Sequence, residues 1–145
     1  MAYAYLIAAD RCHHVSAEII PNLNAGRIVL SDRYVESSFV LQHYDGISYD
    51  KLWEINGGFL IPHISVLLTA EQAVIANRLN QRETFSKYEE KMTRGQELEY
   101  YLKAADYLSK KGFNFITICN NGIEDLMNGT NRLIAEVKKL LMEED

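Results

Sequence analysis

The stretch Ser31–Ser38 reads SDRYVESS, and it directly follows the apolar run RIVL at Arg27–Leu30. Aliphatic and branched residues over this length, preceded by Gly26, are typical of a short buried strand. Asp32 and Arg33 are therefore predicted side by side at the carboxyl end of a strand, the edge at which open α/β sheets bind their ligands. An acid next to a guanidinium group at this edge indicates phosphate chemistry.

The strand pattern at 27–31 recurs at Ile64–Leu68 and Asn114–Cys119. Longer segments have apolar residues at helical spacing, namely Leu98, Tyr101, Leu102, Ala105 and Leu108 in one and Ile134, Val137, Leu140 and Leu141 in another. Thr69–Gln72 fits a capping box that starts a helix after the second strand. Strands that alternate with helices predict an α/β layered fold with a parallel sheet, in a single domain over residues 1–145.

The opening segment is also predicted to be helical. Pro21 is expected to bend or interrupt this helix, because proline has no N–H to donate, and Gly26 is expected to end it. Gly112 stands where the helix that contains Leu108 should have its C-terminal cap.

Composition and charge exclude several classes of protein. With 48% hydrophobic residues, the chain has enough apolar material for a packed core. Its net charge of −5 argues against a nucleic-acid binder, which would have a basic surface. The sequence has no run of about 18 apolar residues that would indicate a membrane span, and its first residues lack the basic start and long apolar stretch of a signal peptide, so a soluble, cytoplasmic protein is expected. Cys12 and Cys119 lack metal-ligand or disulfide spacing and are expected to be reduced, buried thiols.

Four motifs in order resemble those of the thymidylate kinases, the P-loop enzymes that phosphorylate dTMP. They are Tyr5–Arg11 (YLIAADR), Ser31–Gln42 (SDRYVESSFVLQ), Ile61–Leu68 (IPHISVLL) and Arg78–Arg82 (RLNQR), the last followed by an aromatic and acidic segment at Phe85–Glu89. The resemblance extends over essentially the whole chain. It implies a P-loop NTPase-like fold of three layers, a parallel sheet with flanking helices, here without its first βα unit.

The resemblance assigns the charged residues to phosphate and metal. Arg33 would grip the phosphate of the acceptor nucleotide with its planar fork of donors, and Asp32 would hold Mg²⁺ through water. Arg78 and Arg82 share a helix face; both would contact ATP, and Arg82 would stabilise the transferring phosphoryl group. Glu89 would assist the metal. Each assignment has a structural alternative. Asp32 and Arg33 could form an ion pair at the strand end, Arg78 and Arg82 could lie on a solvated helix face, and Glu89 could be a surface residue.

The resemblance also implies a site for the base and the sugar. Arg11 would hydrogen-bond the base, with a helix-surface arginine as the alternative. The other implied substrate-binding residues are Ser37, Ser38 and Gln42. Ile7 replaces the family's phenylalanine that stacks on thymine, and Leu41 replaces a tyrosine near the sugar, so aromatic stacking geometry is lost. These two departures leave open a kinase for another (deoxy)nucleoside monophosphate.

The partners follow from the same resemblance. It implies ATP as co-substrate together with Mg²⁺, dTMP as the favoured acceptor, and a homodimer. Neither nucleic acid nor a membrane is expected as a partner.

The P-loop itself is not among the motifs. It requires the pattern G-x-x-x-x-G-K-[ST], and none of the eight glycines precedes a lysine. In the family the strand before this loop lies inside the sheet, so its absence would expose unpaired strand edges. We therefore expect an N-terminally shortened kinase with little or no turnover as an isolated chain. The alternative is a non-catalytic remnant, or interaction module, that pairs with a chain supplying the P-loop.

Overall fold

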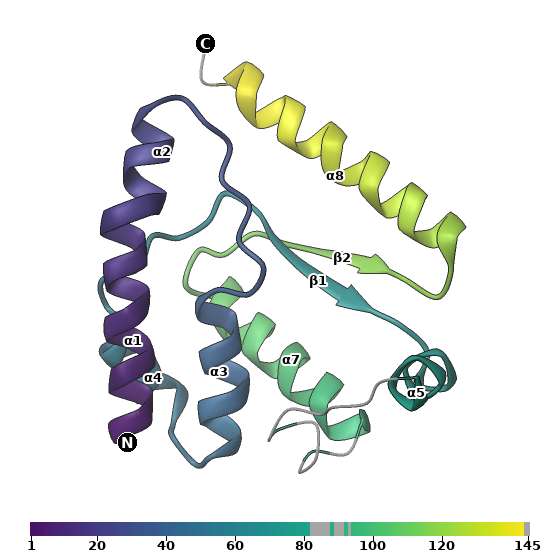
Figure 1. Ribbon diagram of the computed structural model, residues 1–145, viewed down its shortest axis with the longest axis horizontal. Coiled ribbons are helices and arrows are strands. Elements are labelled where there is room, and N and C mark those ends of the chain that lie inside the picture. Colours follow the sequence, from purple (N-terminus) through teal and green to yellow (C-terminus); the bar gives the residue numbers. More distant parts are fainter. Residues whose placement is uncertain (82–87, 89–91, 93, 144–145) are drawn as a thin grey trace. The chain divides into compact units, whose positions relative to one another are not determined.

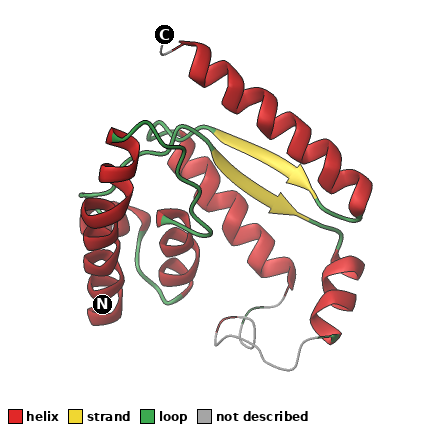
Figure 2. Ribbon diagram, turned by 45° about the horizontal axis from the view of Figure 1, so that its top comes forward, coloured by secondary structure: helices red, strands yellow, loops and turns green. Residues whose placement is uncertain are grey.

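The computed structural model describes residues 1–81, 88, 92 and 94–143. Its chain divides into two compact units. The first unit consists of Met1–Pro62 and Glu99–Phe113, and the second of His63–Leu98 and Asn114–Asp145. The first unit is helical, whereas both described strands belong to the second (Figure 2).

The first unit begins with a long helical segment that contains one irregular turn (Figure 1). Helix α1 (Ala2–His14) continues into a π-helical turn, η1 (Val15–Ile19), and then into α2 (Ile20–Asn24). The π-helical turn directly precedes Pro21, whose ring would clash with the carbonyl four residues earlier in a regular helix. Gly26 adopts φ 70° after the last turn, as a C-terminal cap requires. The predicted interruption and end of this helix are confirmed.

The core of the first unit is centred on α3 (Val35–Tyr44), which packs against α1 and against α4 (Tyr49–Ile55). The largest fully buried side chains among the described residues are Val35, Phe39, Val40, Leu52 and Leu108. Burial of each such side chain is worth about 1.5–3 kcal/mol. This packing fixes α3, the helix that begins two residues after Arg33.

Tyr107 joins α7 (Arg94–Ser109), in the part of that helix that belongs to the first unit, to α3 and α4. The Tyr107 hydroxyl donates to Asp50 Oδ1 at 2.9 Å, and the Tyr107 ring stacks on Phe39 with 5.6 Å between centroids. Burial, and then the hydrogen bond to Asp50, raise the pKa of Tyr107 to about 12. The phenol therefore stays protonated throughout the neutral range, and the hydrogen bond is retained.

The second unit contains two parallel strands, β1 (Ser65–Thr69) and β2 (Phe115–Cys119). Helix α5 (Gln72–Asn80) follows β1, and α8 (Ile123–Glu143) follows β2 and packs on it (Figure 2). The approach of α8 to β2 is close at Gly129. The two strands, their parallel direction and the helices α7 and α8 were all predicted by the apolar patterns, and the structure confirms them.

The predicted strand at 27–31 is absent. Ile28 and Leu30 are 60% and 86% exposed, and the structure assigns no strand there. Among the described residues, the backbone at positions 28–31 donates no hydrogen bond to a strand. An apolar run forms a strand only when its backbone is hydrogen-bonded to a neighbouring strand.

Two smaller predictions are corrected. Thr69 does not start a helix, because its carbonyl accepts a hydrogen bond from Asn120 N–H at 2.8 Å at the end of β1. Helix α5 instead has Glu71 as N-cap, with no side-chain cap. Cys12 and Cys119 are free, but both are exposed rather than buried.

Candidate functional site

Asp32 and Arg33 lie in a tight turn that leads into α3. Arg33 has φ 65°, and it is the one residue other than glycine with a positive φ in the described part of the chain. The Ser31 hydroxyl donates to the Arg33 carbonyl at 2.8 Å and holds the turn. Both charged side chains are exposed, and no ion pair involves either of them within the described residues. The carboxylate and the guanidinium group are therefore free to bind a ligand.

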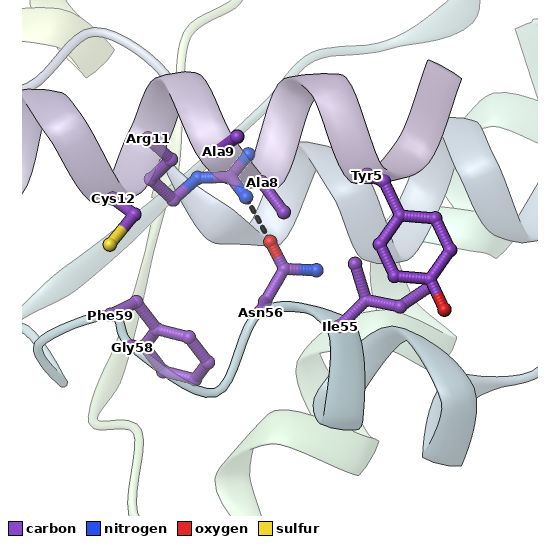
Figure 3. Close-up of a pocket in the computed structure, with 9 residues that line it drawn as sticks. All are labelled: Tyr5, Ala8, Ala9, Arg11, Cys12, Ile55, Asn56, Gly58 and Phe59. Carbon is purple, nitrogen blue, oxygen red and sulfur yellow. Dashed lines mark hydrogen bonds between the residues drawn. The ribbon is translucent and has the colours of Figure 1, made fainter. Parts of the chain in front are cut away.

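Arg11 connects three segments of the first unit. Its Nη2 donates to Ser38 Oγ on α3 at 2.8 Å, and its Nη1 donates to Asn56 Oδ1 just after α4 (Figure 3). The guanidinium carbon also lies 5.9 Å from the centre of the Tyr34 ring. Arg11 and Ser38 come from two different sequence motifs, and this hydrogen bond brings the motifs together.

Burial determines the electrostatics around Arg11. It lowers the pKa of the Arg11 guanidinium, whereas the nearby Tyr34 and Glu36 act in the opposite direction. It also raises the pKa of the Tyr34 phenol, whose oxygen accepts a hydrogen bond from Leu60 N–H at 3.1 Å. In the described residues no carboxylate pairs with Arg11. A partly buried guanidinium whose described hydrogen bonds go to neutral side chains keeps further N–H donors for a ligand that can accept hydrogen bonds.

A pocket of about 240 Å³ lies between α1 and the end of α4 (Figure 3). It is lined by Tyr5, Ala8, Ala9, Arg11, Cys12, Ile55, Asn56, Gly58 and Phe59. Most of this lining is apolar, and Arg11, Asn56 and the Tyr5 hydroxyl supply polar groups.

The predicted substrate residues on α3 occupy one side of that helix. Ser38 and Gln42 are one turn apart and 3% and 4% exposed, and Ser37 and Leu41 are half-buried. Gln42 Oε1 is buried and has no hydrogen-bond partner among the described residues. A buried acceptor left unpaired costs about 1–3 kcal/mol. Ile7, half-buried, lies one turn before Arg11 on α1.

Of the predicted ATP-binding residues, the structure describes Arg78. Arg78 belongs to the second unit, where it donates from Nη2 to Asn120 Oδ1 at 3.3 Å, beyond the end of β2. Arg82 and Glu89 lie outside the described residues.

The described residues offer little for a metal ion. They contain no group of three His, Cys, Asp or Glu side chains that could hold one. Asp32 could contribute a single carboxylate, which suits Mg²⁺ when nucleotide phosphates supply other ligands. No helix in the described ranges is long and apolar enough to cross a membrane.

Asn56 is the residue that sequence reasoning missed. It lies 45 positions from Arg11, so only the folded chain brings the two together. The signal in the sequence was Asn56-Gly57-Gly58, which is typical of a helix end but says nothing about an arginine partner.

The comparison with known families decides what this cluster belongs to. The family model described as thymidylate kinase matches residues 1–129, which is most of the chain. The chain belongs to the thymidylate kinase family. Membership confirms the predicted α/β P-loop kinase fold class, and the parallel strands β1 and β2 are consistent with it.

Individual relatives of the chain are named as members of the same family. A probable thymidylate kinase from Thermococcus kodakarensis is 33% identical over 144 residues, which are 99% of this chain and 67% of the relative. One from Pyrobaculum calidifontis is 36% identical over 70% of this chain and 53% of its own length. The thymidylate kinase of Staphylococcus epidermidis is 32% identical over 94% of this chain and 70% of its own length. This chain therefore spans between about half and 70% of these relatives.

Proposed function

We propose that this chain contains the acceptor-binding part of a thymidylate kinase, the enzyme that transfers the γ-phosphoryl group of ATP to dTMP. The observation that carries the proposal is the hydrogen bond from Arg11 to Ser38. It joins the two motifs that the resemblance assigns to the substrate. Both motifs lie within residues 1–129, which match the family.

The chemistry of each residue suits one part of a deoxynucleotide monophosphate. Arg33 can bind the phosphate in a bidentate manner, because its guanidinium is exposed and pairs with no carboxylate of the described residues. Asp32 would share Mg²⁺ with the phosphates. Arg11 donates to acceptors on the base, and Gln42 Oε1, which is buried and has no partner in the part of the chain that the structure describes, can accept from a base N–H.

Fewer observations support the proposed roles of the residues that would bind ATP. Arg78, Arg82 and Glu89 keep their proposed roles toward ATP, Mg²⁺ and the transferring phosphoryl group. Positioning and charge stabilisation supply most of the catalysis in phosphoryl transfer. Because no glycine is followed by lysine, we propose that the isolated chain binds dTMP but turns it over slowly or not at all.

Isothermal titration of the chain with dTMP tests this function. We expect saturable binding that weakens about 10- to 100-fold in Arg33→Ala and in Arg11→Ala, because each loses charge-assisted hydrogen bonds. Arg132→Ala is the matched control, since Arg132 is an exposed arginine of α8 in the second unit. Absence of dTMP binding, or equal affinity in all four proteins, would contradict the proposal.

A kinase for another nucleoside monophosphate is the second candidate. It is favoured by Ile7 and Leu41, which are aliphatic and half-buried where the resemblance implies aromatic side chains. The same titration with dUMP, dCMP and dGMP separates the two candidates. Clear preference for dTMP removes this alternative, and equal binding of dTMP and dUMP supports it.

A partner-dependent interaction module also has one observation behind it. Among the described strands β1 pairs only with β2, and Val66 and Leu68 of β1 are 38% and 58% exposed. An open strand edge can pair with another chain. Sedimentation that gives only a monomer at low concentration, without loss of dTMP binding, would count against this role.

A further inference from the structure

The side chain of Asn56 is held in one orientation. It is 5% exposed and follows the last turn of α4. Its Nδ2 donates to the Leu52 carbonyl at 2.8 Å, and its backbone N–H donates to the same carbonyl at 3.1 Å. With the amide nitrogen fixed in this way, the amide oxygen is directed away from α4, and it accepts the hydrogen bond from Arg11 Nη1.

Although the nearby carboxylates of Asp10 and Glu36 favour the charged form of Arg11, the three groups in described contact with its guanidinium are neutral. They are the Ser38 hydroxyl, the Asn56 amide and the Tyr34 ring. A carboxylate in place of the amide would neutralise the guanidinium charge, whereas an amide oxygen fixes its direction and leaves the charge available. A freely rotating arginine would lose more side-chain entropy on binding a ligand than one already fixed.

We propose that Asn56 is a positioning residue for Arg11. Its amide oxygen fixes the guanidinium beside Ser38 without neutralising it, so that the charge and the remaining N–H donors are available to the nucleotide. This inference rests on the proposed function, because it concerns the same substrate.

The chain offers a matched control at Asn22. Its Nδ2 donates to the Glu18 carbonyl four residues earlier at 2.7 Å, and its Oδ1 accepts from Arg27 Nη1 at 2.7 Å. The hydrogen-bond pattern is the same as at Asn56, but Arg27 is exposed and outside the predicted site. Asn22→Ala therefore removes an equivalent bond with no expected effect on nucleotide affinity.

A double-mutant cycle in dTMP affinity tests the positioning role. We expect Asn56→Ala to weaken dTMP binding about tenfold in the wild-type background and to have no further effect when Arg11→Ala is present. Asn56→Asp, which keeps the side-chain shape, should weaken binding by a similar factor because its carboxylate pairs with Arg11. Equal weakening by Asn56→Ala in both backgrounds, or none in the wild type, would overturn the proposal.

NMR of the arginine side chain separates this inference from the proposed function. Restricted rotation of the Arg11 guanidinium should give resolved Nη–H signals in the wild type and in Asn56→Asp, and averaged signals in Asn56→Ala. The Asn22→Ala spectrum should match the wild type at Arg11. If the wild type binds no dTMP, the proposed function fails, and these spectra alone decide the positioning role. Unchanged Arg11 signals in Asn56→Ala would overturn it, and Asn56→Asp supplies the affinity test if the alanine variant does not fold.

Discussion

Arg33 combines an unfavourable backbone conformation with a charge that has no ion-pair partner among the described residues. A φ of 65° suits glycine, and for a residue with a Cβ it costs about 1–3 kcal/mol. The Ser31 hydroxyl and the buried start of α3 at Val35 hold the chain in this turn. Strain of this kind collects where a side chain must point in a particular direction to act, which agrees with a phosphate-binding role for Arg33.

The strain at Arg33 predicts that a glycine variant at this position is more stable than an alanine variant. Arg33→Ala and Arg33→Gly both remove the guanidinium, so both should lose dTMP affinity to the same extent. The glycine variant should nevertheless have a free energy of unfolding about 1 kcal/mol above that of the alanine variant, because glycine adopts positive φ without strain. Urea unfolding followed by circular dichroism measures this difference.

The control for this comparison is Lys51 in α4, where the backbone is helical. There the order should reverse, with Lys51→Gly about 1 kcal/mol less stable than Lys51→Ala. An alanine variant at position 33 as stable as the glycine variant would show that the positive φ carries no strain.

The sequence predicted which residues belong to the candidate site, but it did not predict their backbone conformation or their partners. Asp32 and Arg33 were predicted at the carboxyl end of a strand, but the structure assigns no strand there and places them in a turn, exposed and unpaired within its described part. The positive φ of Arg33 was not predicted, because SDRY contains no glycine to suggest it. Asn56 was missed because its partner lies far away in the sequence.

At the scale of elements, the contact between α8 and β2 depends on Gly129. A Cβ atom at residue 129 would lie 3.2 Å from the Cβ of Ile118 and closer still to its Cγ2. Ile118 is a buried residue of β2, so it has little room to move. The absence of a side chain at position 129 is what allows the helix to approach the strand so closely.

Gly129→Ala is therefore expected to destabilise the chain. Alanine favours helix by about 1 kcal/mol over glycine, but overpacking against Ile118 should outweigh this and lower the free energy of unfolding by about 1–3 kcal/mol. Gly122→Ala is the control, since a Cβ there meets nothing within 4 Å, and its effect should stay within about 0.5 kcal/mol. Urea unfolding gives both values, and a Gly129→Ala protein as stable as the control would contradict the close contact.

The elements that the sequence predicted correctly are those with local evidence. The alternation of apolar and polar residues in β2 and the helical spacing of apolar residues in α7 and α8 are enough to predict these elements, because each pattern repeats along its own segment. The run at 27–31 had an equally apolar pattern but no strand to pair with in the described residues. Thr69 matched a capping box by letter, but its backbone takes part in the sheet.

At the scale of the whole molecule, the residues predicted to bind the acceptor nucleotide and the described residue predicted to bind ATP belong to different units. Those assigned to the acceptor nucleotide all lie in the first unit, and Arg78, assigned to ATP, lies in the second. No local pattern in the sequence predicts this division. The single domain, the homodimer and the pairing with a P-loop supplied by another chain stay predictions.

The central claim is that the first unit binds dTMP through Arg11, the turn at Asp32 and Arg33, and the start of α3. Titration of the isotope-labelled chain with dTMP, followed by backbone amide chemical shifts, tests this most directly. We expect saturable shifts that cluster around residue 11 and residues 32–42, with β1, β2 and α8 unaffected. Shifts confined to the second unit, or none at millimolar dTMP, would contradict it.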